Sequence, residues 1–224
     1  EYKTIRTESL GGCNQPLFPC ASFEVSWPEF DQMNSSVKAT LSDRINYAVA
    51  YDDPDADDFS LQQMADAFVR DFNSFQNEFP ENQFSWYFKS HVEILSNTQT
   101  ILSLSAVTEH YTGGAHGNRT VYFININPEN GEDITLNSVF KTGYESALRS
   151  EAEKAFRKAR ELDEYQDLTE AGFEFPEGKF ELNSNYGFGS NGIVFCFNAY
   201  EIAPYAMGPT EFTVPWSALK EYRK

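Results

Sequence analysis

The chain is poor in histidine and cysteine, two residue types common in catalytic and metal centres. It has three histidines and three cysteines among 224 residues, and its longest strongly apolar run covers only the five residues from Ile193 to Phe197. A membrane-spanning helix needs about 20 apolar residues, so the sequence predicts none. It also has no GxxxxGK[ST] phosphate loop, no GxSxG nucleophile elbow and no HExxH zinc motif. The commonest signatures of nucleotide, serine-hydrolase and zinc-protease chemistry are therefore missing.

Basic residues are scarce as well. The chain has 17 Lys and Arg against 34 Asp and Glu, a formal net charge of −17. This charge repels phosphate, so we expect no nucleic-acid partner and no docking on an anionic lipid surface. It favours cationic partners, although the same charge also serves solubility.

Hydrophobic residues, by contrast, make up 41% of the chain and include 20 Phe, enough to bury a core. Apolar residues recur every three or four positions in three segments, which predicts helices over 34–50, 60–79 and 144–162. Ser60 followed by Gln63 resembles a capping box at the start of the second helix. The stripe of this helix, predicted to be core, consists of Leu61, Met64, Ala65, Phe68, Phe72, Phe75 and Phe79.

The remaining apolar segments have the length and flanking residues of β-strands. The first, 1–27, is extended, with Phe23, Val25 and Trp27 alternating with polar residues. The others cover 84–95, 100–111, 118–127, 180–186, 193–198 and 211–214. We therefore expect an α+β fold, with a mostly antiparallel sheet, about three packed helices and two closely associated subdomains. A strong turn signal at Pro128–Gly131 places the boundary between an N-terminal domain, 1–127, and a C-terminal domain, 128–224.

The cysteines leave one alternative open. Cys13 and Cys20 flank a short loop, and they form either a disulfide, which would indicate an oxidising compartment, or two free thiols. Cys196 lies between two phenylalanines and is expected in the core. Because the chain begins at Glu1 rather than Met, we expect a leader, with or without a lipid anchor, that was either processed off or left out of this sequence.

Metal sites find little support. The aspartate-rich loop 51–59 fails the EF-hand pattern, because its sixth position is not Gly and its twelfth is not Glu, so a solvated loop or another kind of calcium site remains. Glu109, His110 and His116 could supply a histidine and carboxylate set, but a Gly-rich turn interrupts it. We expect neither a metal nor a cofactor.

Two segments differ from the rest and hold the candidate ligand-binding residues. The first is YTGGAHGN, in which glycines permit positive φ and expose backbone N–H groups, or simply form a tight turn. The second is a rigid loop with two tyrosines and a glutamate that bind a ligand or only lock the loop. The candidates are Tyr111, Thr112, Gly113, Gly114, His116, Gly117 and Asn118 in the first, and Tyr200, Glu201, Pro204, Tyr205 and Glu211 in the second.

These segments carry a family resemblance. The blocks YTGGAHGN, ITLNSVF and YEIAPYAMGPTEFTVPWSAL, over about residues 20–221, resemble the paired extracytoplasmic domains of unknown function in the anti-sigma factor RsiV and in the region ahead of the catalytic domain of the peptidoglycan deacetylase PdaC. The resemblance implies a bacterial, two-part α+β module outside the cytoplasm. In RsiV the module binds lysozyme. No HxxxH histidine pair is present here, so deacetylase activity does not carry over.

We therefore expect a non-enzymatic cell-envelope module that binds a cationic protein such as lysozyme, or peptidoglycan fragments. The alternative is a hydrolase with His116 as general base, oriented by Glu109, Glu201 or Glu211 if the two segments meet. A third hypothesis is that both segments only stabilise the fold.

Overall fold

The computed structural model describes residues 2–8, 13, 18–50 and 60–224. The chain divides into two compact units: unit 1 comprises residues 1–93 and 106–119, and unit 2 comprises 94–105 and 120–224. The boundary predicted near residue 128 lies inside unit 2. The division is interleaved because three long strands, β3 to β5, each pass from one unit into the other.

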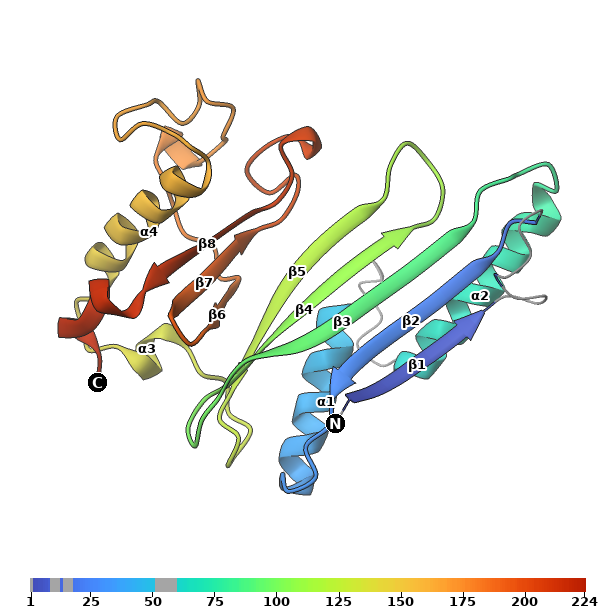
Figure 1. The fold of residues 1–224 in the computed structure, drawn as a ribbon, viewed down its shortest axis with the longest axis horizontal. Helices are drawn as coiled ribbons and strands as arrows, with labels where there is room; N and C mark the ends of the chain where they lie inside the picture. The colour runs from blue at the N-terminus through green and yellow to red at the C-terminus, as the bar shows by residue number, and fades with distance from the viewer. Residues whose placement is uncertain (1, 9–12, 14–17, 51–59) are drawn as a thin grey trace. The chain divides into compact units, whose positions relative to one another are not determined.

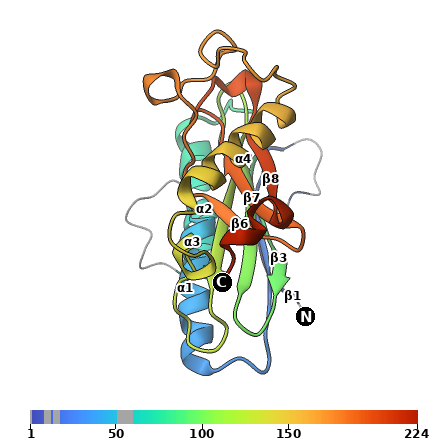
Figure 2. The same ribbon diagram turned by 90° about the vertical axis from the view of Figure 1, so that its left-hand side faces the viewer.

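A five-stranded sheet runs through unit 1. Its strands are, in sheet order, β1 (Tyr2–Glu8), β2 (Ala21–Pro28), β3 (Trp86–Asn97), β4 (Leu102–Tyr111) and β5 (Asn118–Ile126). The helices α1 (Ser35–Val49) and α2 (Leu61–Glu78) cover the same face of this sheet (Figures 1 and 2). The expected α+β class, with mostly antiparallel sheet, is confirmed. One pairing was not expected: β2 and β3 are parallel, because the chain crosses over through both helices before it returns to the sheet.

Both predicted helices of unit 1 begin directly after a capping residue. Asn34 Oδ1 accepts a hydrogen bond from Ser36 N at 2.9 Å, and the capping box between Ser60 and Gln63 is present. The stripe of α2 is buried as far as Phe72, but its end departs from the prediction. Phe79 is 49% exposed and is not core, because it caps the helix at the point where Pro80 turns the chain away.

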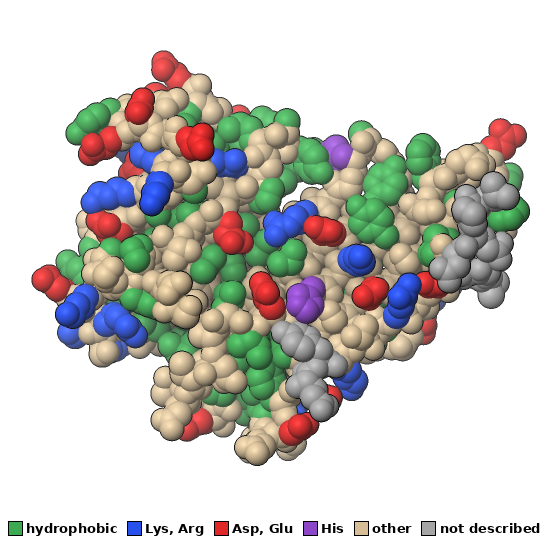
Figure 3. Space-filling model, in the orientation of Figure 1, with side chains coloured by type: hydrophobic (Ala, Val, Ile, Leu, Met, Phe, Trp, Pro, Cys, Tyr) green, Lys and Arg blue, Asp and Glu red, His purple; other side chains and the backbone are tan. Residues whose placement is uncertain are grey.

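The core of unit 1 is aromatic and lies between the helices and the sheet. Phe23 and Phe88 from neighbouring strands stack with ring centroids 4.6 Å apart, and Phe68 of α2 meets Phe88 edge-on. Along β3, buried residues alternate with exposed ones, so the opposite face of the sheet is open. Figure 3 shows acidic, basic and histidine side chains intermixed over β2 and β3 on this open face.

Unit 2 contains a small antiparallel sheet and one long helix. Its elements are α3 (Leu136–Val139), α4 (Glu145–Ala159), η2 (Pro176–Gly178), β6 (Tyr186–Phe188), β7 (Gly192–Phe197), η3 (Tyr205–Met207), β8 (Thr210–Pro215) and η4 (Trp216–Tyr222), where η denotes a 3₁₀ helix. The strand predicted over 180–186 is wrong except at its last residue, because 180–185 are irregular. The helix predicted to reach residue 162 ends at Ala159.

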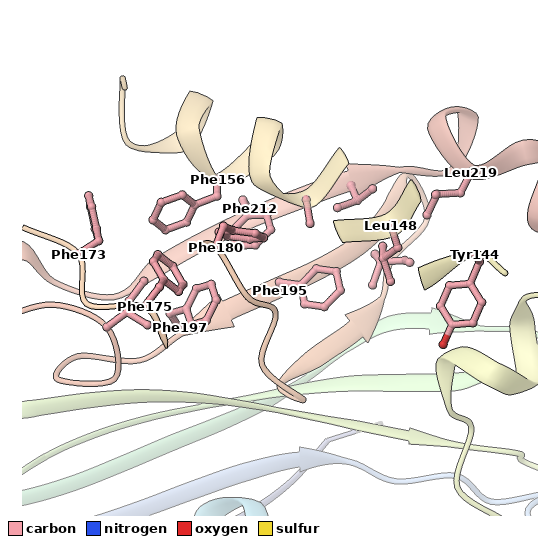
Figure 4. Close-up of a cluster of buried hydrophobic side chains, with 14 of the residues drawn as sticks. Tyr144, Leu148, Phe156, Phe173, Phe175, Phe180, Phe195, Phe197, Phe212 and Leu219 are labelled. Carbon is pink, nitrogen blue, oxygen red and sulfur yellow. The ribbon is translucent and has the colours of Figure 1, made fainter. Parts of the chain in front are cut away.

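Phe156 of α4 lies at the centre of the core of unit 2 (Figure 4). Its ring centroid is 5.0 Å from that of Phe173, 5.5 Å from Phe175 and 5.3 Å from Phe180. The strands contribute further aromatic rings from below the helix (Figure 4). Cys196 on β7 is fully buried, as the sequence predicted.

Cys13 and Cys20 are joined by a disulfide with their Cα atoms 5.3 Å apart, within the usual range. Cys13 N donates a hydrogen bond to Glu8 Oε2 at 3.1 Å, at the end of β1. The bridge therefore ties the segment after the edge strand to the start of β2.

Candidate functional site

The glycine-rich segment of unit 1 is the connection from β4 to β5. Tyr111 ends β4, residues 112–117 form the loop, and Asn118 begins β5. Gly113 and Gly114 have φ of +100° and +95°, so the turn requires glycine at both positions. Tyr111 Oη donates to Gly114 O at 3.0 Å, which closes the loop on itself.

A tyrosine that the sequence reasoning did not single out completes this surface. Tyr87 of β3 stacks on Tyr111 with ring centroids 6.1 Å apart, and both belong to unit 1. A Cβ added at Gly117 would lie 2.8 Å from Tyr87 Oη and 3.1 Å from His110 O. The last glycine of the motif therefore allows the loop backbone to approach the tyrosine pair. Only the alternation along β3 could have indicated Tyr87.

The acid–base residues of this segment have partners close by. His116 is exposed, and its Nδ1 lies 2.9 Å from Gly117 O, whereas Glu109 Oε1 lies 3.8 Å from Arg119 Nε. Glu201 and Glu211, the other carboxylates considered for the hydrolase hypothesis, belong to unit 2. The structure therefore gives Glu109 an arginine partner and His116 a backbone partner.

The second segment, residues 200–209, lies in the loop between β7 and β8 of unit 2, which covers residues 198–209 and which we call the tyrosine loop. Tyr200 is 65% exposed and has a φ of +69°, which is unusual for a residue with a large side chain. Its ring lies 5.6 Å from that of the half-buried Tyr205, the first residue of η3. Pro204 directly precedes η3 and is exposed, and Glu211 is an exposed residue of β8. The loop thus presents two aromatic rings side by side from an irregular backbone.

Glu201 holds this loop rather than pointing away from it. One carboxylate oxygen accepts from Asn183 Nδ2 at 2.7 Å, and the other accepts from Asn198 N at 2.9 Å. Asn198 in turn pairs with the backbone of Val121, since its Oδ1 accepts from Val121 N and its Nδ2 donates to Val121 O. Both oxygens of Glu201 are therefore engaged in positioning the loop.

Arg160, at the end of α4, clamps the other side of the loop. Its guanidinium donates to Thr210 Oγ1 at 2.8 Å, to Met207 O at 2.9 Å and to Gly208 O at 2.9 Å. It also lies over the ring of Phe173 at 5.4 Å, and burial lowers its pKa. Nothing in the sequence pattern connects Arg160 with residues almost 50 positions later, so sequence reasoning missed this clamp.

Unit 2 also has two adjoining hollows beside α4, of about 630 and 770 Å³, that share Arg149 and Glu181 as lining residues. The larger is walled by Tyr144 and Tyr186, whose pKa values are raised chiefly by burial, so both stay neutral phenols at ordinary pH. Among the described residues, Arg149 forms no ion pair. The sequence patterns gave no sign of this concavity.

Within the described ranges, no group of three or more His, Cys, Asp or Glu is arranged to hold a metal ion. The aspartate-rich loop considered for calcium, 51–59, lies outside the described residues. Within the same ranges, every helix is too short or too polar to span a lipid bilayer.

Two family models match the chain, one in each half. Residues 19–119 match a family described as deacetylase PdaC, and residues 137–217 match a protein family of unknown function, DUF3298. The first match includes the YTGGAHGN block, and the second includes the tyrosine loop. The resemblance predicted from these motifs is confirmed. No functionally curated protein matches the chain.

Solved structures of bacterial proteins share the fold. A DUF3298-family protein of Bacteroides fragilis is 20% identical, with a TM-score of 0.72 over 100% of this chain and 93% of that one. A DUF3298-family protein of Pseudomonas aeruginosa is 18% identical, with a TM-score of 0.63 over 100% of this chain and 94% of that one. At these identities the likeness concerns the fold alone.

Proposed function

We propose that this chain, which joins a PdaC region to a DUF3298 region, is a non-enzymatic binding module of the bacterial cell envelope that recognises a cationic protein such as a lysozyme. One observation carries the proposal: the tyrosine loop holds Tyr200, exposed and with positive φ, against Tyr205. Strained backbone conformations that are held in place by the surrounding structure are typical of ligand-binding surfaces.

The chemistry of the loop favours binding over catalysis. Tyrosine supplies a large, rigid contact surface at a low cost in side-chain entropy, which is why it is enriched at the centres of interfaces. Glu201, the carboxylate nearest these rings in sequence, uses both oxygens to hold the loop. The loop is therefore organised before a partner arrives, which reduces the entropy lost on binding.

The charge of the chain supports a cationic partner. At −17 it attracts a basic protein over a distance of about 8 Å at physiological salt, and it raises the rate of encounter. Exposed aromatic rings and excess negative charge complement a basic protein surface. Affinity for such a partner is expected to fall as salt rises, without vanishing at physiological ionic strength.

A location outside the cytoplasm follows from the same proposal. The disulfide between Cys13 and Cys20 is typical of an oxidising environment, which supports this location. An envelope protein would meet a secreted basic protein in this environment.

The proposal is tested by equilibrium binding of chicken-type lysozyme at low and at physiological salt, with cytochrome c as a comparably basic control. Tyr200→Ala and Tyr205→Ala are each expected to weaken lysozyme binding at least tenfold, about 1.4 kcal/mol. The matched control is Tyr47→Ala, because Tyr47 is a tyrosine of similar exposure, 67%, on α1. Equal affinity for cytochrome c, or equal loss in the control variant, would refute recognition by the tyrosine loop.

A second candidate ligand, a cell-wall glycan, is favoured by the larger hollow beside α4. The half-buried ring of Tyr186 in its wall suits the apolar face of a sugar ring, and Arg149 with Glu181 offers polar contacts of both signs. Binding of soluble peptidoglycan fragments that Arg149→Ala abolishes, while Tyr200→Ala leaves it unchanged, would support this candidate. Absence of fragment binding to the unmodified chain would dismiss it.

A further inference from the structure

A groove lies at the C-terminal end of α2, in unit 1. Figure 1 shows that the chain turns back into β3 after this end of the helix. Its volume is about 590 Å³, and its lining residues are Phe75, Glu78, Phe79, Pro80, Glu81 and Asn82. The rings of Phe75 and Phe79 lie 5.0 Å apart, and Phe79 is 49% exposed. We call this surface the α2 groove. It is the place where the apolar stripe of α2 continues beyond the core.

The charged side chains around the α2 groove destabilise the end of the helix that forms it. The C-terminus of an α-helix carries a negative partial charge and is stabilised by basic side chains, yet the last turn of α2 has none. Instead it carries Glu78, and Glu81 follows three residues later. No Lys or Arg occurs between Arg70 and Lys89. Negative charge is thus concentrated at a negative helix end.

Glu78 and Glu81 lack a cationic partner among the described residues. Both are exposed, and they flank an exposed aromatic ring. A local charge arrangement that destabilises the protein without its ligand is expected at a functional position, where the ligand supplies the opposite charge.

We propose that the α2 groove binds the guanidinium of an arginine side chain from a cationic protein. The planar cation would lie over the ring of Phe79, and its N–H groups would donate to the carboxylates of Glu78 and Glu81. An ammonium group could use the same carboxylates, but it would lack the planar face that stacks on the ring. The inference rests on the proposed function only for the charge of the partner, because the groove and the tyrosine loop share no residue.

The test uses a capped tri-arginine peptide as the probe and the same peptide with citrulline in place of arginine as the uncharged counterpart. In two-dimensional NMR spectra of the ¹⁵N-labelled full chain at low salt, tri-arginine is expected to shift the backbone amide signals of the non-proline residues between 75 and 82. The citrulline peptide is expected to leave them in place. Signals that move instead throughout the acidic surface would overturn the proposal.

Variants distinguish binding at the α2 groove from general electrostatic attraction between the peptide and an acidic protein. Glu78→Gln with Glu81→Gln is expected to weaken tri-arginine binding at least fivefold, and Phe79→Leu, which keeps an apolar side chain, at least twofold. Glu170→Gln with Glu174→Gln removes the same number of exposed negative charges from unit 2 and is expected to change affinity less than twofold. Equal weakening by both double variants would overturn the proposal.

The outcomes for the two proposals remain distinguishable. Tyr200→Ala is expected to leave tri-arginine binding unchanged, whether or not it weakens lysozyme binding. If the peptide binds the groove while lysozyme does not bind the chain, the groove stands and the proposed function fails. If lysozyme binds through the tyrosine loop and the peptide leaves residues 75–82 unaffected, the groove proposal alone fails.

Discussion

Replacement of Arg160 by Met would remove the clamp on the tyrosine loop while keeping most of the side-chain stem. The three donor–acceptor distances between its guanidinium and Thr210, Met207 and Gly208 are 2.8 to 2.9 Å. Hydrogen bonds from a charged donor contribute about 1.5–3 kcal/mol each. The full sum is not expected, because burial of the guanidinium opposes it and water can reach the freed carbonyls.

We therefore expect Arg160→Met to lower the free energy of unfolding by about 2 kcal/mol, and Tm by about 4–8 °C. Arg160→Lys should recover only part of this loss, because one ammonium cannot reach three acceptors held in a fork. The measurement is urea unfolding followed by circular dichroism, together with hydrogen exchange at the amides of Met207 and Gly208. These amides donate to Pro204 O and Tyr205 O within the loop.

The matched control is Arg149→Met, which removes an exposed arginine from the same helix. Since Arg149 forms no ion pair among the described residues, its loss should change stability by less than about 0.5 kcal/mol. If the two variants were equally stable, and exchange at the two amides were unchanged, the clamp would not hold the loop.

Three further predictions concern local structure. Glu161 has a φ of +56° and occupies the position after the end of α4 where glycine is usual. Glu161→Gly should therefore raise the free energy of unfolding in urea by about 0.5–1 kcal/mol, and a decrease would contradict this assignment. The hydrogen bond from Cys13 N, and then the one from Arg6, lowers the pKa of Glu8 below its ordinary value. The stabilisation is present above the ordinary pKa and is lost as pH falls through the lowered one, so Glu8→Gln should remove this part of the acid dependence of Tm. Replacing Cys13 and Cys20 together by Ser should lower stability by about 2.5 kcal/mol in the chain-entropy model, and unchanged unfolding would show that the bridge constrains nothing.

The sequence indicated the helices well because their signals are local. Caps and apolar spacing lie within a few residues of each other, as at Ser60 and Gln63. The error at Phe79 has a physical origin: periodicity shows which side of a helix is apolar, but not where the sheet beneath it ends. The exposed end of the stripe became visible only when burial was known.

Strand pairing was harder to predict because it depends on distant residues. The parallel alignment of β2 with β3 follows from the crossover through α1 and α2, which no local pattern encodes. The strand expected over 180–186 is absent up to residue 185, because asparagine side chains there make the hydrogen bonds that a strand would make with its backbone. Asn185 Oδ1 accepts from Phe123 N, and its Nδ2 donates to Val121 O. Alternating Phe180 and Leu182 resemble a strand, although Phe180 packs with the rings around Phe156.

The two candidate segments were located from their glycines and tyrosines, but the residues that position them were not. Arg160 and Tyr87 come from other elements, and only the fold brings them to these loops. Whether each segment binds a ligand stays a prediction. The structure shows that Glu201 holds the tyrosine loop through both carboxylate oxygens, whereas the sequence indicated it as a ligand-binding or catalytic carboxylate.

Gly117 offers a way to separate fold maintenance from binding in the glycine-rich segment. An added Cβ would lie 2.8 Å from Tyr87 Oη and 3.1 Å from His110 O, so Gly117→Ala must displace one of them. The Tyr87 hydroxyl is the closer of the two contacts and must move, and we expect a loss of about 1 kcal/mol in urea unfolding. Tyr87→Phe removes the hydroxyl, so the double variant should recover more than half of this loss. No recovery would mean that the carbonyl contact dominates and that the tyrosine does not select the glycine. If the double variant is stable and still binds lysozyme as the unmodified chain does, the motif maintains the fold and recognition lies elsewhere.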